Sequence, residues 1–254
     1  MTSKVICIGD SHVSFFSGYN ALSPKYPDKG KNRNAFFEAY RIGSVLAYNL
    51  IQSNTTERGS EKILELLKTI PKKSVLLFCF GEIDIRCHLI KQSIKQNKPV
   101  LFVVRECVER YLDFINQIVL LDFKVIVLAP TPTSNNYDPE YPYYGTMEER
   151  NSCTILFNEI LQKKCAQFAM DYICINKYLI NKKGLTKSEY FFDALHLSTL
   201  SLVFVKKELF RLSQFNNKSF IETVSLELNI AFNVVISKLK KINRYIRSSV
   251  LLKH

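Results

Sequence analysis

The chain has 254 residues, 47% of them hydrophobic, which is enough for a sizeable core and excludes a globally disordered protein. The 35 Lys and Arg residues outnumber the 23 Asp and Glu residues, and the resulting formal net charge of +12 favours an anionic partner: a nucleic acid, an acidic lipid or an acidic glycan. The apolar runs are too short to cross a bilayer, and the N-terminal residues lack the cleavage site of a secretory signal.

The seven cysteines favour a reducing compartment. Their odd number and their spacing argue against a disulfide framework, and no C-x-x-C pattern indicates a metal site. Several of them lie in apolar segments, where Cys commonly serves as a small core residue. We therefore expect a cytoplasmic protein without a metal centre.

Apolar patterning predicts strands that alternate with helices. Buried strands are expected at residues 4–8, 74–80, 124–129 and 172–175, and helices at residues 35–50, 60–69, 100–121 and 146–169. Ser60 is a candidate N-cap, and Thr146 with Glu149 forms a candidate capping box. This alternation favours a doubly wound parallel sheet, in which functional loops lie at the carboxyl ends of the strands.

The first such end carries Gly9-Asp10-Ser11-His12. A serine at a strand-to-helix turn can present its hydroxyl at the edge of the sheet. The alternative is that Asp10 or Ser11 only caps the following helix, because both residue types are preferred N-caps. The tetrapeptide alone does not decide between these two interpretations.

Two further motifs gather acidic, basic and imidazole groups. The segment 81–88, Gly-Glu-Ile-Asp-Ile-Arg-Cys-His, follows the second buried strand, and a salt-bridged turn is its alternative explanation. In Asp193-Ala-Leu-His196, a carboxylate three residues before an imidazole can lie beside it on one helical turn. It could then fix the tautomer of the imidazole and stabilise its protonated form, although an isolated pair of this kind would usually be a cap.

In order and spacing over about residues 4–200, these motifs resemble the SGNH/GDSL hydrolase family. The resemblance implies a flavodoxin-like three-layer α/β/α sandwich with a central parallel sheet, and a catalytic triad of Ser11, His196 and Asp193. Gly43 is the candidate for the oxyanion-hole glycine of that family, and Asp10 belongs to the nucleophile motif and is counted with the substrate-binding residues.

One position departs from the family pattern. Ile83 stands where the family has an Asn whose side chain donates a hydrogen bond to the oxyanion, and loss of one such donor typically costs about 10²–10³ in turnover. We expect Arg86 or His88 to substitute for it. The alternatives are that the backbone N–H groups of Ser11 and Gly43 suffice, or that catalysis has been lost.

The implied chemistry is serine-dependent hydrolysis or transfer of an acyl group, with O-acetyl expected, on a carbohydrate or polysaccharide precursor. Hydrolysis requires no cofactor, whereas a transferase would need a donor such as acetyl-CoA. The Gly-Glu-Ile-Asp string is similar to members associated with bacterial surface polysaccharides. The alternatives are a lipase-like or thioesterase-like enzyme, or a non-catalytic glycan-binding or scaffold protein on the same fold.

A tyrosine-rich loop follows the strand at 124–129. It contains Tyr137, Tyr141, Tyr143 and Tyr144. Aromatic rings suit sugar binding because they combine apolar area with a polar tip, so this loop is a candidate wall of a substrate cleft. The alternative is that it only packs on the sheet.

Beyond the expected α/β domain of residues 1–214, residues 215–254 form a predicted C-terminal extension. Its apolar residues recur at helical spacing, and its basic residues fall mainly on the opposite face; the apolar stripe is Leu228, Phe232, Val235, Leu239, Ile242, Ile246 and Val250. This helix could dock on the domain or form a homo-oligomer, place the protein peripherally on an anionic membrane, or hold a polyanionic glycan. Nucleic acid is less expected, because no binding module accompanies the charge.

Overall fold

The computed structural model describes residues 4–133, 140–182, 184–212 and 215. The chain divides into two units, 1–205 and 206–254. Apart from Phe215, the predicted extension of residues 215–254 lies outside the described residues. The basic amphipathic helix and the domain boundary at residue 214 therefore stay predictions.

Five parallel strands form one sheet in the order β2-β1-β3-β4-β5. They are β1 (Val5–Gly9), β2 (Phe37–Arg41), β3 (Val75–Cys79), β4 (Lys124–Leu128) and β5 (Asp171–Ile173). The strand order reverses between β1 and β3, and ligands of doubly wound sheets bind at such a switch point. Gly9 pairs with Arg41 of β2 and with Cys79 of β3, so the ends of these three strands lie level.

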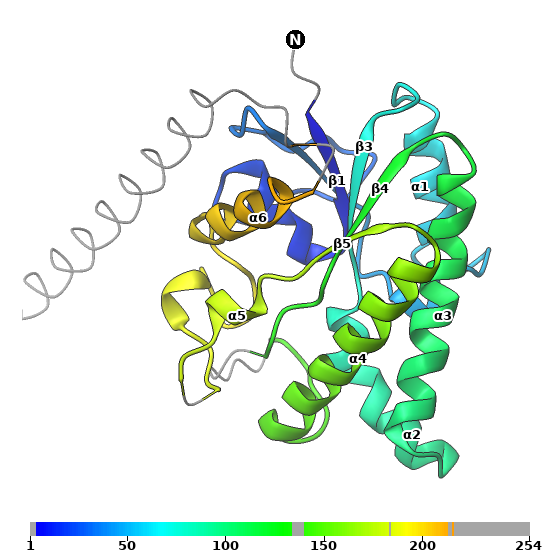
Figure 1. Ribbon diagram of the computed structural model, residues 1–254, viewed down its shortest axis with the longest axis vertical. Helices are drawn as coiled ribbons and strands as arrows, with labels where there is room; N and C mark the ends of the chain where they lie inside the picture. Colours follow the sequence, from blue (N-terminus) through cyan, green and yellow to red (C-terminus); the bar gives the residue numbers. More distant parts are fainter. Residues whose placement is uncertain (1–3, 134–139, 183, 213–214, 216–254) are drawn as a thin grey trace, which may run out of the picture. The chain divides into compact units, whose positions relative to one another are not determined.

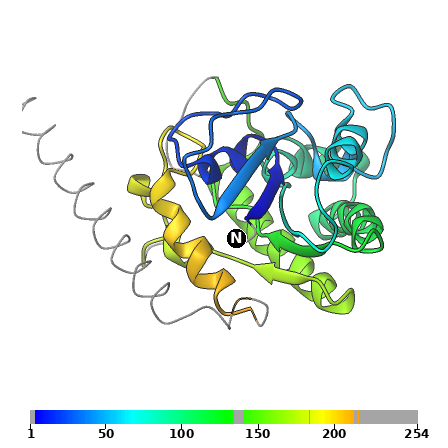
Figure 2. The same ribbon diagram turned by 90° about the horizontal axis from the view of Figure 1, so that it is seen from above.

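Helices cover both faces of the sheet, in a three-layer α/β/α arrangement (Figures 1 and 2). The α-helices are α1 (Gly59–Leu67), α2 (Ile90–Gln96), α3 (Val100–Val119), α4 (Met147–Gln167), α5 (Asn176–Leu179) and α6 (Leu202–Leu209). Figure 1 shows α1, α3 and α4 on one side of the sheet and α5 on the other. The main core joins buried strand residues such as Phe78 to helix residues such as Val108 and Phe157. The predicted fold class is confirmed.

The helix predicted for residues 35–50 is wrong. Residues Phe37–Arg41 form β2 instead, followed by a loop and the short 3-10 helix η2 (Ala47–Asn49). The side chain of Asn34 accepts hydrogen bonds from the N–H groups of Phe36 and Phe37, at 2.9 and 3.2 Å, and so ends the preceding loop. Pairing with β1 then outweighs the helical pattern, as is common for aromatic segments.

The ends of two other helices test the capping predictions. Ser60 is not the N-cap of α1, because Arg58 occupies that position and the Ser60 hydroxyl donates to the carbonyl of Gln52. The capping box of α4 is confirmed: the Glu149 N–H donates to the Thr146 hydroxyl at 3.1 Å, and the Thr146 N–H donates to the Glu149 carboxylate at 2.7 Å. None of the helices in the described part of the chain has the length and apolarity to span a membrane.

Candidate active site

Ser11 lies directly after the carboxyl end of β1, as the first residue of the 3-10 helix η1 (Ser11–Ser17). The buried Asp10 side chain caps this helix by accepting the His12 N–H at 2.8 Å. A side chain on Gly9 would collide with the carbonyl oxygen of Cys79, so only glycine lets β1 end this close to β3. The capping interpretation of Asp10 is therefore correct, and the same turn exposes part of Ser11.

Asp193 and His196 lie together in a compact turn near the end of the first unit. The Asp193 carboxylate accepts the backbone N–H groups of Leu195 and His196, at 2.8 and 2.6 Å, and the ring Nδ1 of His196 at 2.7 Å. The segment is not the predicted helical turn, because an antiparallel bridge between Phe191 and Leu197 closes it as a loop. The predicted contact of the two side chains is present all the same.

The imidazole of His196 joins this turn to β1. Its Nε2 lies 2.9 Å from the hydroxyl oxygen of Ser11, while its Nδ1 contacts Asp193. With the proton on Nδ1 donated to Asp193, the lone pair of Nε2 faces the Ser11 hydroxyl. The structure thus brings Ser11, His196 and Asp193 into one hydrogen-bonded chain, here called the serine chain.

The charges of the serine chain suit proton transfer. Burial opposes ionisation of Asp193, but hydrogen bonds from His196 and Leu195 outweigh it and lower the pKa of Asp193 to about 2. Burial lowers the pKa of His196; its hydrogen bond with Asp193 partly offsets this, and the neighbouring His12 adds to the lowering. Near neutral pH, Asp193 is ionised and His196 is neutral, which is the state a general base requires.

The backbone near Ser11 offers candidate donors for an oxyanion. Within the described residues, the N–H groups of Ser11 and Gly43 donate no hydrogen bond. Gly43 follows β2 with φ +147°, and the carboxylate of Glu57 fills the space where a Cβ would lie. The next segment is anchored by Asp84, whose carboxylate accepts the N–H groups of Ala47 and Tyr48, at 2.7 and 3.1 Å.

Arg86 and His88 were predicted to replace the missing Asn donor. They lie in the π-helical turn η3 (Asp84–Leu89), and Arg86 donates to Glu82 at 2.8 Å and to the carbonyl of Pro142. No hydrogen bond in the described part of the chain joins Arg86 or His88 to Ser11 or His196. Their role towards an oxyanion stays a prediction, and the observed contacts direct Arg86 to Glu82.

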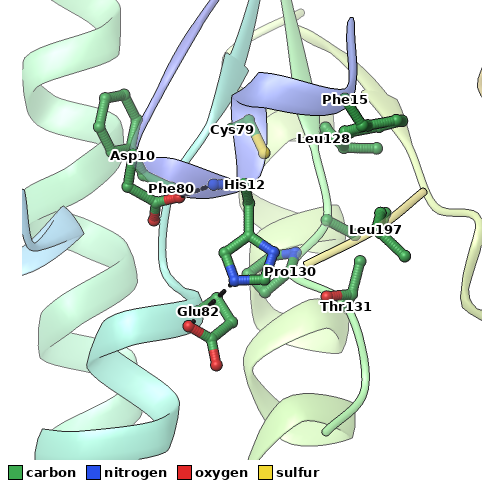
Figure 3. Close-up of a pocket in the computed structure, with 11 residues that line it drawn as sticks. Asp10, His12, Phe15, Cys79, Phe80, Glu82, Leu128, Pro130, Thr131 and Leu197 are labelled. Atoms are coloured by element: carbon green, nitrogen blue, oxygen red, sulfur yellow. Dashed lines mark hydrogen bonds and ion pairs between the residues drawn. The ribbon is translucent and has the colours of Figure 1, made fainter. Parts of the chain in front are cut away.

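A second polar chain, here called the ionic chain, lies beside the serine chain. The Nε2 of His12 is 3.2 Å from the carboxylate of Glu82, whose other oxygen accepts Nε of Arg86 at 2.8 Å, and all three side chains are buried (Figure 3 shows the first contact). Despite burial, His12 and Arg86 together lower the pKa of Glu82 to about 2. Despite its own burial, His12 has a raised pKa because Glu82 stabilises its charge.

The pairing of His12 with Glu82 was not predicted. His12 comes three residues after Gly9, and Glu82 comes three residues after Cys79, which is the residue that pairs with Gly9. Equal distances from paired strand ends place the two side chains side by side. The register of β1 against β3 was the missing signal, since the sequence motifs alone do not show it.

A small cavity with room for about one water molecule adjoins the ionic chain. It lies between the carboxyl ends of β1, β3 and β4, and its lining includes His12, Glu82, Thr131 and Leu197 (Figure 3). Asp10 also contributes to the lining, and burial raises its pKa to about 7, partly offset by the charge and backbone N–H of His12. The wall of this cavity therefore carries several ionisable groups.

The tyrosine-rich loop reaches the serine chain. The Tyr141 hydroxyl donates to the Asp193 carboxylate at 3.2 Å, and the Tyr141 ring meets the His196 ring edge-on at 5.3 Å. Tyr143 and Tyr144 are exposed, with the Arg150 guanidinium 4.3 Å from the Tyr143 ring. Tyr137 lies outside the described residues. At Tyr141, the loop contacts the candidate site and does not only pack on the sheet.

The His, Cys, Asp and Glu side chains of the described ranges contain no group of three that could hold a metal ion. None of the seven cysteines, which all lie in the described ranges, forms a disulfide.

Comparison with known proteins places the fold among solved structures. No protein-family model matches the sequence, and no curated protein matches it. The chain is similar to "a putative platelet activating factor from Streptococcus pneumonia", with TM-score 0.52, 19% identity and coverage of 82% of this chain and 83% of that one. It is also similar to "a putative acylhydrolase" from Bacteroides fragilis, with TM-score 0.54, 12% identity and coverage of 82% and 85%. At these identities the likeness shows the fold.

Proposed function

We propose that the protein is a serine-dependent acyl esterase or acyltransferase. The observation that carries this proposal is the serine chain, with 2.9 Å between Ser11 and His196 and 2.7 Å between His196 and Asp193. A hydroxyl, an imidazole and a carboxylate in this order form an activated nucleophile on several unrelated folds. The B. fragilis protein of similar fold is described as a putative acylhydrolase, which is the same class of activity.

In the proposed reaction, Nε2 of His196 takes the proton of the Ser11 hydroxyl as the serine oxygen bonds to the ester carbonyl carbon. The carbonyl electron pair moves to the oxygen, which becomes an oxyanion near the N–H groups of Ser11 and Gly43. When the carbonyl reforms, the alcohol leaves with the proton from His196, and the acyl group stays on Ser11. Water or a sugar hydroxyl then takes the acyl group by the same steps, and Asp193 stabilises the His196 imidazolium in both halves.

The proposed substrate is an O-acylated, specifically O-acetylated, carbohydrate or polysaccharide precursor. Its support is the resemblance of the three sequence motifs and the position of Tyr141 beside His196 and Asp193. Tyr143 and Tyr144 offer further exposed aromatic area in the same loop, and aromatic faces suit sugar rings. For acyl transfer, acetyl-CoA would be the donor; hydrolysis needs no cofactor.

The test is hydrolysis of a chromogenic acetyl ester by the full-length protein. We expect turnover that Ser11→Ala abolishes, whereas the exposed Ser53→Ala serves as a matched control and retains it. Acetyl-CoA and an acetylated glycan are then offered in turn, and mass spectrometry follows acetyl gain or loss. Absence of ester turnover in the wild type contradicts the proposal and favours a non-catalytic binding protein, whereas preference for long acyl chains favours a lipase-like enzyme.

A further inference from the structure

The ionic chain ends beside the catalytic base of the proposed reaction. The rings of His12 and His196 lie 5.1 Å apart, centroid to centroid, and both side chains are buried. His12 is fixed at its other side by Glu82, which Arg86 holds in turn. The backbone N–H of His12 is also fixed, because Asp10 accepts it. These contacts hold the imidazole of His12 beside that of His196.

We propose that His12 is a positioning residue that acts through His196: as a buried imidazolium held by Glu82, it places a fixed positive charge beside His196 and disfavours protonation of that base. Two like charges close together in a low-dielectric interior repel strongly, so the neutral form of His196 is favoured. The expected benefit is activity that persists to lower pH. Only this effect on rate rests on the proposed function.

Other groups near the two imidazoles also shift the balance between their protonated and neutral forms. Asp193 and, more weakly, Glu82 favour the protonated form of His196, whereas burial and His12 favour its neutral form. Around His12 itself, Glu82 and Asp10 favour the charged form, and Arg86 opposes it. Ser11 contacts His196, and Tyr141 contacts Asp193, each through an uncharged hydroxyl group. Of these groups, His12 is the one whose positive charge lowers the pKa of His196.

Nuclear magnetic resonance of the ¹⁵N-labelled imidazoles in the full-length protein tests this inference without any turnover. The chain has 4 His residues, so single His→Gln variants assign each signal. We expect wild-type His12 to be protonated at pH 7 and His196 to titrate below the ordinary histidine pKa of 6.5. His12→Gln should raise the His196 midpoint by about one pH unit or more, and adding Glu82→Gln should lower it again.

A neutral His12 at pH 7 in the wild type overturns the inference, and so does an unchanged His196 midpoint in a folded His12→Gln variant. If His12→Gln does not fold, the wild-type titration alone decides. The inference and the proposed function fail separately: an inactive protein with the expected midpoints contradicts the function and leaves the charge of His12 established. A merely structural role of His12 would change stability but not the His196 midpoint.

A different observation, at the turn between α2 and α3, carries a second proposal. Three large apolar side chains, Ile94, Leu101 and Phe102, are exposed within nine residues, with Ile94 at 64% and Phe102 at 55%. Exposed basic side chains surround them: Lys91, Lys95, Lys98 and Arg105. No Asp or Glu occurs from residue 85 to residue 105. We call these seven residues the basic apolar tip; Figure 1 shows α2 meeting the start of α3 there.

We infer that the basic apolar tip docks on an anionic lipid surface. Two contributions favour such binding. The apolar side chains bury apolar area at the boundary of the acyl chains, and the surrounding basic side chains are attracted to the anionic headgroups. The turn itself is well fixed, because the Ser93 hydroxyl donates to the carbonyl of Lys98 at 2.6 Å and the Lys98 N–H donates to the carbonyl of Ser93 at 3.0 Å. The tip therefore needs little ordering to dock.

Sedimentation of the full-length protein with phosphatidylcholine vesicles, with and without phosphatidylglycerol, tests the tip. We expect binding to anionic vesicles that the pair Ile94→Ser and Phe102→Ser weakens about fivefold or more. The pair Leu120→Ser and Ile155→Ser is the matched control, because these side chains are 79% and 61% exposed elsewhere. Equal vesicle binding by the tip pair and the wild type overturns the proposal. Loss of self-association by the tip pair without loss of vesicle binding also overturns it, and would indicate a second copy of this chain as the partner.

Discussion

Ser11 and His12 are neighbours at the end of β1, yet their side chains enter two polar chains of different character. Ser11 is half-buried and shares a hydrogen bond with His196, whose partner Asp193 is also only partly buried. His12 is buried and forms an ion pair with Glu82, which also binds Arg86. The serine chain can therefore meet a substrate, whereas the ionic chain can act only through its field and its contribution to stability. Single substitutions can therefore break the serine chain and the ionic chain separately.

Breaking the serine chain should have the largest effect, a loss of turnover. Among the described residues, His196 is the one group within hydrogen-bond distance of the Ser11 hydroxyl, so we expect His196→Ala to lower ester turnover by about 10⁴-fold or more. Steady-state kinetics on an acetyl ester measures the fall. Far-ultraviolet circular dichroism checks that the variant is folded, and a folded variant with wild-type turnover would contradict the role of His196.

Breaking the ionic chain should act first on stability. Glu82→Ala leaves His12 and Arg86 buried without their shared acceptor, and we expect the free energy of unfolding to fall by about 3–5 kcal/mol. Urea denaturation followed by fluorescence or circular dichroism measures the change. The control is Glu109→Gln, which breaks the more exposed pair of Glu109 with Lys164 and should cost about 1 kcal/mol or less. An equal loss in the free energy of unfolding for the two variants would show that the ionic chain stabilises the fold no more than a surface ion pair does.

Asp10 precedes Ser11 and accepts the backbone N–H of His12, and its ionisation should make stability depend on pH. Burial raises its folded pKa to about 7, above its ordinary value of 3.8, so its contribution is most favourable below pH 4 and is lost as the pH rises through 7. Asp10→Asn keeps an acceptor for the His12 N–H and cannot ionise. We expect this variant to be more stable than the wild type at pH 8, by roughly 1–3 kcal/mol, and to lose that advantage at pH 4. If the difference between the urea midpoints of the two proteins is the same at pH 4 and pH 8, the raised pKa of Asp10 is contradicted.

Tyr141→Phe should have the smallest effect. It removes one hydrogen bond to the Asp193 carboxylate, which keeps its bonds from His196 and Leu195. A single bond of this kind contributes about 1 kcal/mol, so we expect turnover to fall roughly fivefold. Comparison of kcat with KM shows whether Tyr141 also binds substrate, because a loss confined to kcat would leave Tyr141 with no part in binding.

Sequence patterns identified most of the sheet because β1, β3 and β4 are continuous apolar runs covered on both faces. They missed β2, which pairs only with β1 in the sheet and whose mixed polar and aromatic residues also fit a helix. At the site, the spacing of Asp193 and His196 predicted their contact, because three residues suffice for it locally. The turn that holds them is not helical, since it depends on the bridge between Phe191 and Leu197.

The contacts of the ionic chain could not be predicted from sequence patterns. His12 and Glu82 are 70 positions apart in the numbering, and only the pairing of Gly9 with Cys79 brings them together. The sequence marks Ile83 as a lost donor and predicts Arg86 or His88 as its replacement. Glu82 instead takes up Arg86 on one side and His12 on the other. Long-range ion pairs of this kind require the strand register, which the motifs themselves do not contain.

Labelling by a fluorophosphonate probe, followed by peptide mass spectrometry, tests the central claim most directly. An ordinary serine hydroxyl is a weak nucleophile, so rapid labelling reports activation by a neighbouring base. We predict a single adduct on Ser11 of the wild type, formed much more slowly in His196→Ala and absent in Ser11→Ala. Absence of an adduct in the wild-type protein, or the same adduct in Ser11→Ala, would contradict the claim that His196 and Asp193 activate Ser11.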